Sequence, residues 1–173
     1  MTGNKESKLY NSVTRFSEFG AVASGYLILI AGILITYGVI LRYFFKHPTI
    51  WELEMASYLL IAATFFASPS ALHHNVHVNL DLITANIKEK PRNILYIITG
   101  ILGLIFAIIM CERGIQLWLD AYQNDWRSGT LWNPKLVYPY TIIPIGMIWF
   151  AIQYYVEINK RIRRLARKDS NPD

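Results

Sequence analysis

Three histidines and an aspartate lie close together near the middle of the chain, at His73, His74, His77 and Asp81. His73 and His77 are four residues apart, so on a helix they would share a face and could bind a metal ion. The stretch lacks the glutamate spacing of a metalloprotease helix. We therefore interpret these residues as the polar end of a helix, and we expect no catalytic residue, no metal and no cofactor.

Histidines could also bind haem in a membrane anchor of a redox enzyme complex. Such an anchor would place them inside its membrane spans, facing the interior of the bundle. His47, His73, His74 and His77 are the four histidines of this chain, and all lie at or beyond the ends of apolar segments. The redox anchor stays open as the alternative function, and a Soret band in the purified protein would support it.

Charged residues surround Trp51, namely Arg42, Lys46, Glu52 and Glu54. Glu54 borders an apolar segment, where a charged side chain is costly unless it is paired. We expect Arg42 to pair with Glu52 or Glu54, within the chain or through a partner.

The elements that must position these residues are apolar and long. The chain has 173 residues, of which 53% are hydrophobic and 17% charged, against about 25% charged in an average soluble domain. A helix of about 20 apolar residues crosses a bilayer. We expect four spans, at residues 19–41, 55–72, 93–111 and 136–156. Residues 27–41 lack the polar stripe of a soluble helix, so the fold class is an all-α membrane protein, one membrane domain over residues 1–173.

The basic residues are distributed unevenly between the two sides that these spans define. The N-terminal segment, the second loop and the C-terminal tail hold twelve Lys and Arg, whereas the first and third loops hold five. Cytoplasmic loops carry the excess of Lys and Arg. Both termini are therefore predicted to be cytoplasmic.

Amphipathic patterns extend beyond the spans. Residues 5–18 and 79–90 space their apolar residues as interfacial helices do, so we expect both to lie at the membrane surface. The third span is expected to continue as a helix beyond the membrane until Ser128–Gly129 breaks it. Pro139 and Pro144 can bend the fourth span, because each removes a backbone donor.

The middle of each span is free of charged residues. Transporters usually place charges or broken helices at the membrane midplane, where the substrate binds. This chain is therefore interpreted as a scaffold or accessory subunit, and not as an enzyme.

Four motifs occur in a characteristic order around the spans: LRYFF at 41–45, WELEMASYLL at 51–60, ALHHNVHVNLDLI at 71–83 and LWNPKLVYPYTIIPIG at 131–146. In these motifs the chain resembles the small membrane subunit, the Q subunit, of tripartite ATP-independent periplasmic (TRAP) transporters. The resemblance covers nearly the full length.

The resemblance implies the partners and the setting. A large membrane subunit would carry the sodium and substrate sites and move as an elevator, and a periplasmic binding protein would deliver organic acids such as C4-dicarboxylates or sialic acid. The small subunit would be a multi-pass scaffold in the bacterial inner membrane, in contact with lipids and not with nucleic acid. The candidate interface with the large subunit or binding protein comprises Arg42, Trp51, Glu52, Glu54, His77, Asp81, Trp132 and Pro134.

Overall fold

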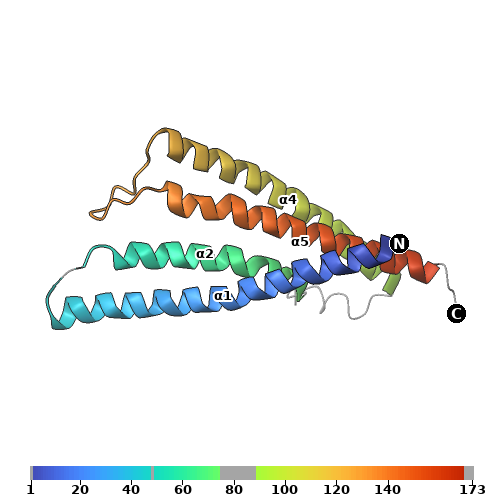
Figure 1. Ribbon diagram of the computed structural model, residues 1–173, viewed down its shortest axis with the longest axis horizontal. Coiled ribbons are helices and arrows are strands. Elements are labelled where there is room, and N and C mark those ends of the chain that lie inside the picture. The colour runs from blue at the N-terminus through green and yellow to red at the C-terminus, as the bar shows by residue number, and fades with distance from the viewer. Residues whose placement is uncertain (1, 48, 75–88, 170–173) are drawn as a thin grey trace.

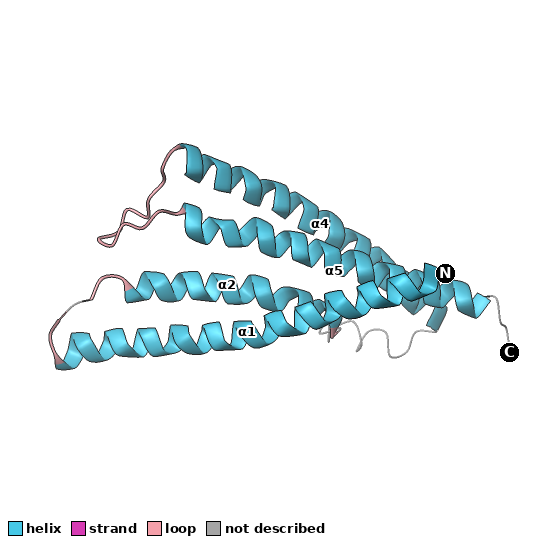
Figure 2. Ribbon diagram, in the orientation of Figure 1, coloured by secondary structure: helices cyan, strands magenta, loops and turns pink. Residues whose placement is uncertain are grey.

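The computed structural model describes residues 2–47, 49–74 and 89–169. These residues form four long helices, joined in the described parts by short loops (Figures 1 and 2). The helices are α1 (Thr2–Phe44), α2 (Glu52–His73), α4 (Glu89–Gln123) and α5 (Val137–Asp169). The segment predicted as an interfacial helix over 79–90 lies outside the described residues, apart from its last two residues, which begin α4.

Each helix contains a stretch long and apolar enough to cross a membrane, as the sequence predicted. The stretches are Ser12–Phe44, Glu52–His73, Ile94–Gln123 and Val137–Arg163. They are longer than the charge-free runs because the helices continue through flanking charged residues, such as the exposed Arg42, whose long side chain can reach water. The third helix continues beyond its apolar run and ends at Gln123, before the predicted Ser128–Gly129 break.

Residues 5–18 are helical, but they form the first part of α1 rather than a separate interfacial helix. Gly20 follows this segment and does not interrupt the helix. A Cβ at Gly20 would lie 2.6 Å from the Trp149 ring and 2.7 Å from the carbonyl oxygen of Phe66. The glycine therefore permits close helix packing instead of a break. The location of residues 5–18 at the membrane surface stays a prediction.

Two prolines lie in α5, as expected, and they have different effects. Pro139 falls in the first turn, where helix donors lack intrahelical partners in any case. Pro144 lies within the helix and removes one backbone hydrogen bond. α4 packs closely beside it, because a Cβ at Gly114 would lie 2.9 Å from Ile143.

The four helices lie side by side in the order α1, α2, α5, α4 (Figure 1). Two helical hairpins, α1–α2 and α4–α5, meet along α2 and α5, and towards the termini α1 also contacts α5 directly. Both chain termini lie at one end of it. The fold therefore agrees with termini on one side of a membrane, while the choice of the cytoplasmic side rests on the Lys and Arg count.

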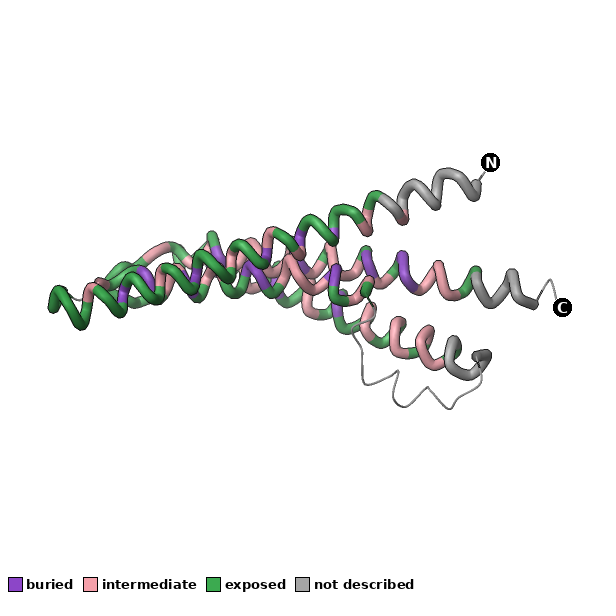
Figure 3. Tube along the Cα trace, turned by 90° about the horizontal axis from the view of Figure 1, so that it is seen from below, coloured by how far each residue is buried: buried purple, intermediate pink, exposed green. Residues whose placement is uncertain are grey.

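Buried residues are sparse along the helices (Figure 3). The buried apolar side chains are mostly alanines: Ala31, Ala56, Ala62, Ala63, Ala107 and Ala121. Small residues let helices approach closely, and membrane proteins use them to pack helices in lipid. The large aliphatic side chains of α1 and α4 are mostly exposed in the isolated chain, and they are therefore available to lipid or to another subunit.

Candidate functional site

The loop between α4 and α5, residues 124–136, folds back on itself and is called the 124–136 hairpin below (Figure 2). The Leu136 amide donates to the Trp126 carbonyl at 2.9 Å, and the Ser128 amide donates to the Pro134 carbonyl at 3.1 Å. Gly129 has a φ of 69°, a conformation that glycine adopts without steric cost. Pro134 thus contributes a backbone acceptor to the hairpin.

Charged side chains hold the base of the 124–136 hairpin. Lys135 Nζ lies 2.8 Å from Asp125 Oδ1, and Arg127 Nη2 lies 3.5 Å from Asp125 Oδ2. The hydrogen bond from Lys135, together with the charges of both basic residues, outweighs a smaller effect of desolvation and lowers the pKa of Asp125 below its ordinary value. The Asp125 carboxylate therefore remains charged at neutral pH and is linked to Arg127 and Lys135, the two residues that face each other across the base of the loop.

The 124–136 hairpin contacts the start of α2, far away in the sequence. Thr130 Oγ1 donates to Glu54 Oε2 at 2.6 Å, and the Tyr58 hydroxyl donates to the other Glu54 oxygen. The Trp51 and Trp132 rings lie 6.4 Å apart, centroid to centroid. These contacts, called the hairpin-end junction below, bring together three of the predicted interface residues, Trp51, Glu54 and Trp132.

Glu52 lies in a different environment from that of Glu54. Its side chain is packed between α2 and α1, and the residue is only 3% exposed. A Cβ at Gly38 would lie 2.7 Å from Glu52 Oε1, so the glycine leaves room for the carboxylate. Neither Glu52 oxygen has a hydrogen-bond partner among the described residues.

The predicted ion pair of Arg42 with Glu52 or Glu54 is not among the salt bridges of the described residues. Arg42 is exposed and lies one helical turn beyond Gly38 on α1. Glu52 is instead inserted between the helices, and Glu54 receives hydrogen bonds from two hydroxyls. His77 and Asp81, the remaining predicted interface residues, lie outside the described residues.

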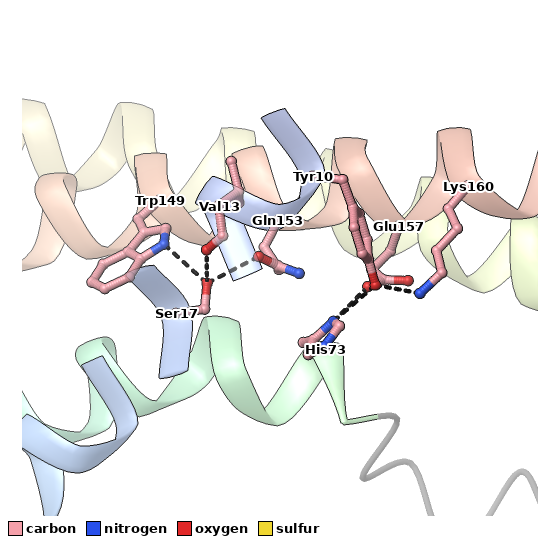
Figure 4. A network of polar contacts seen from close by, with 8 residues as sticks. All are labelled: Tyr10, Val13, Ser17, His73, Trp149, Gln153, Glu157 and Lys160. Carbon is pink, nitrogen blue, oxygen red and sulfur yellow. Dashed lines mark hydrogen bonds and ion pairs between the residues drawn. The ribbon is translucent and has the colours of Figure 1, made fainter. Parts of the chain in front are cut away.

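A second set of contacts joins α1, α2 and α5 at the end where the termini lie (Figure 4). His73 Nδ1 lies 2.9 Å from Glu157 Oε1, and both side chains are largely buried. Lys160 donates to the Tyr10 hydroxyl, and the Tyr10 ring faces His73 edge-on at 5.9 Å. His73 therefore binds a carboxylate of α5, and the described residues contain no group of three metal-ligating side chains.

Further along α1 and α5, Ser17 connects the helices within the apolar region. Ser17 Oγ lies 2.9 Å from Gln153 Oε1 and accepts a hydrogen bond from Trp149 Nε1 at 3.2 Å (Figure 4). Ser17 and Gln153 are fully buried, and Gln153 Nε2 has no partner among the described atoms. These contacts and those of His73 form the terminal-end junction.

The sequence did not predict the terminal-end junction, although it contained a weak signal. Gln153 is a polar residue in the otherwise apolar fourth span, and Ser17 precedes the first span. Buried polar groups require hydrogen-bond partners, so both could have been expected to face another helix. Which helix they face depends on the tertiary arrangement, which periodicity alone does not give.

Both junctions connect helices rather than assemble reacting groups. At the end of the molecule that carries the 124–136 hairpin, the Glu54 carboxylate accepts hydrogen bonds from two hydroxyls. At the end where the termini lie, the Glu157 carboxylate accepts a hydrogen bond from the His73 imidazole. In each case the contact links the α1–α2 hairpin to the α4–α5 hairpin. The arrangement is suited to fixing two helical hairpins relative to each other.

Comparison with known proteins identifies the family. The family model described as "Tripartite ATP-independent periplasmic transporters, DctQ component" matches residues 31–164. The chain is also similar to the isethionate TRAP transporter permease protein DctMQ of Oleidesulfovibrio alaskensis, with 23% identity over 153 residues. That match covers 82% of this chain but only 24% of the relative, so the chain spans about a quarter of the relative's length. Since the family model covers most of the chain, from the last third of α1 to near the end of α5, the chain belongs to the DctQ components of TRAP transporters, which are non-enzymatic permease subunits.

Proposed function

We propose that this small DctQ subunit is the static scaffold of a sodium-driven transporter that imports organic acids. The observation that carries the proposal is that polar contacts join its two helical hairpins at both ends. An elevator mechanism needs a fixed frame, because one domain slides while another keeps its place in the bilayer. Family membership sets aside the redox-anchor alternative.

The proposed partner is a large membrane subunit that carries the substrate and sodium sites. The relative from Oleidesulfovibrio alaskensis is a DctMQ protein, in which both components share one chain. This fusion supports direct contact between the two components. The charge-free middle parts of the four spans support a substrate path in the partner rather than in this chain.

The proposed substrates are organic acids, with C4-dicarboxylates and sialic acid as examples. The relative's name specifies isethionate, which is a small organic anion. A substrate of this class supports the same chemistry for the transporter to which this chain contributes.

We further propose that the end of the molecule with the 124–136 hairpin faces the periplasm and helps to dock the binding protein. Five Lys and Arg lie on that side, against twelve on the side of the termini. Trp132 is 37% exposed and Trp51 is 38% exposed, and aromatic residues are enriched in protein interfaces. Arg42 and Pro134 lie in the neighbouring segments, so they remain in the proposed interface.

The test is purification of the tagged chain from its native membranes in mild detergent, followed by reconstitution into liposomes. We expect a large multi-span protein to copurify. We expect uptake of an organic acid only when that partner, the binding protein and an inward sodium gradient are all present. Sodium-dependent substrate binding by the isolated chain would contradict the scaffold function.

A further inference from the structure

One exposed face of α4 carries charged side chains within the apolar stretch of the helix. Glu112 and Arg113 directly follow the charge-free run 93–111, but the stretch Ile94–Gln123 continues beyond them. Both residues are exposed, as is Gln116. Gln116 Oε1 accepts a hydrogen bond from Arg113 Nη1 at 3.0 Å, and Gln116 Nε2 donates to Glu112 Oε1 at 3.3 Å. These three residues are called the α4 polar cluster below.

The charged residues of the α4 polar cluster lie deeper in the array than the aromatic residues further along α4. The residue that follows them, Gly114, packs against α5, because a Cβ there would lie 3.5 Å from the Pro144 nitrogen. Pro144 is seven residues, about 10 Å of helix, beyond the start of α5 at Val137. Trp118 and Tyr122, whose rings stack, come later along α4. Since Trp and Tyr are enriched at membrane interfaces, the charged residues lie on the hydrocarbon side of this interface.

Lipid chains are unsuitable neighbours for the α4 polar cluster, because they offer no hydrogen-bond partners. A carboxylate and a guanidinium can each form several hydrogen bonds, whereas Gln116 supplies one to each. An arginine can extend its side chain to the lipid headgroups, but the glutamate side chain is shorter and reaches less far. Charged residues within membrane spans almost always face protein or a water-filled cavity. The α4 polar cluster therefore favours protein over lipid as its neighbour.

A line of exposed aliphatic side chains leads along α4 to the polar cluster. The line consists of Ile98, Leu102, Ile105 and Ile109, which are 49–60% exposed. The four residues are spaced alternately four and three apart, and Glu112 and Gln116 continue this spacing. Helices that pack along one another use this spacing. The line and the α4 polar cluster together are called the outer face of α4, and among the described residues no other helix covers it.

The exposed surface of α1 differs from the outer face of α4 in its charge. No charged residue lies between Glu18 and Arg42. The exposed Thr36 hydroxyl donates to the Gly32 carbonyl of its own helix at 2.8 Å, so it needs no further partner. This surface of α1 is therefore compatible with lipid chains.

We propose that the large membrane subunit packs against the outer face of α4 and supplies polar groups to Glu112 and Arg113. This inference rests on the proposed function, in which a large subunit is the partner of this chain. The relative from Oleidesulfovibrio alaskensis, in which both components share one chain, supports such direct contact. The charged residues of α4 thus serve subunit recognition within the membrane, and the large subunit shields them from lipid.

Photo-crosslinking in the purified complex tests which helix contacts the large subunit. An amino acid with a benzophenone side chain is placed at Ile105 on the outer face of α4 or, as the matched control, at Ile33 on α1, which is 59% exposed. We expect a covalent adduct with the large subunit from the α4 position and none from the α1 position.

The other crosslinking outcomes would overturn the choice of α4. If the complex contains the large subunit, adducts from α1 alone or from both helices would show that the contact is not specific to α4. Adducts from neither helix would show that the outer face of α4 meets lipid. Absence of the large subunit from the purified material would instead overturn the proposed function, and this inference with it.

A second test removes the charges from α4. The variant Glu112→Leu/Arg113→Leu makes the outer face more apolar, which suits lipid but not a polar partner. We expect the amount of large subunit that copurifies with this chain to fall about tenfold, because hydrogen bonds between helices contribute to association in membranes. Thermal unfolding of the isolated chain should not change, since both residues are exposed in it.

The matched control for the leucine variant is Thr36→Val, which removes a polar group from the exposed surface of α1. We expect this control to copurify the large subunit as the wild type does. An unchanged amount of large subunit with the leucine variant, or an equal loss with the control, would overturn the proposal.

Discussion

The two junctions of the molecule connect the same pair of helical hairpins by different means. At the hairpin end a loop supplies Thr130 and Trp132, and the hydrogen bond to Glu54 is exposed. At the terminal end all groups come from helices, and Ser17 and Gln153 are fully buried. Hydrogen bonds shielded from water are stronger than exposed ones. Removing one partner is also costly, because the other partner is then left buried without a hydrogen bond. The comparison indicates that the terminal-end junction holds the helices together more firmly than the hairpin-end junction does.

The largest effect is expected at Gly20, next to the terminal-end junction. Gly20→Ala would place a Cβ 2.7 Å from the Phe66 carbonyl, and a helix backbone cannot easily move away. We expect a loss of about 1–3 kcal/mol in unfolding free energy, as for other overpacked sites. Thermal unfolding in detergent measures this loss. Gly25→Ala is the matched control, since nothing lies within 4 Å of a Cβ there, and a comparable loss in the control would contradict the packing argument.

The next effect concerns the buried pair of His73 and Glu157. Glu157→Ala removes an acceptor 2.9 Å from His73 Nδ1 and leaves a largely buried imidazole without it. We expect a destabilisation of about 1–3 kcal/mol. A double-mutant cycle with His73→Ala separates the pair from effects of either residue alone. Additive losses would show that the two side chains do not interact.

A smaller effect is expected at the hairpin end. Thr130→Val keeps the side-chain shape but removes the hydroxyl that donates to Glu54. We expect a loss of about 0.5–1.5 kcal/mol in stability, below that of Glu157→Ala. Unfolding of the two variants under the same conditions provides the comparison. A larger loss for Thr130→Val would reverse the order of the two ends.

The smallest effect is expected for Lys135→Gln, at the exposed base of the 124–136 hairpin. The pKa of Asp125 is lowered in the folded state, mainly through Lys135. The ion pair of Asp125 with Lys135 therefore stabilises the folded protein at any pH above the pKa that Asp125 has in the unfolded chain. This stabilisation is lost as the pH falls through the lower pKa that Asp125 has in the folded protein. Thermal unfolding of both proteins should differ slightly at neutral pH and converge in acid. A difference that persists in acid would point to another cause.

Much of the fold could be predicted from the sequence, because apolar length is a local property. The four spans and the family resemblance follow from runs and motifs along the chain. Partners of polar groups were harder to predict: Glu54 and Thr130 are 76 residues apart. Arg42 was expected to pair with an acidic residue, but Gly38 lets Glu52 enter the helix interface, and Glu54 binds hydroxyls instead. Such outcomes depend on which helices become neighbours.

Over most of their length the helices lie in one layer in the order α1, α2, α5, α4, and this order also affects how the subunit is held at its depth in the bilayer. An array one helix thick has a longer outline in the membrane plane than a compact bundle of the same helices. Moving it along the membrane normal would drag more apolar side-chain area into water at one surface. Because this cost rises with the area exposed, the array resists displacement along the membrane normal, as the proposed scaffold function requires.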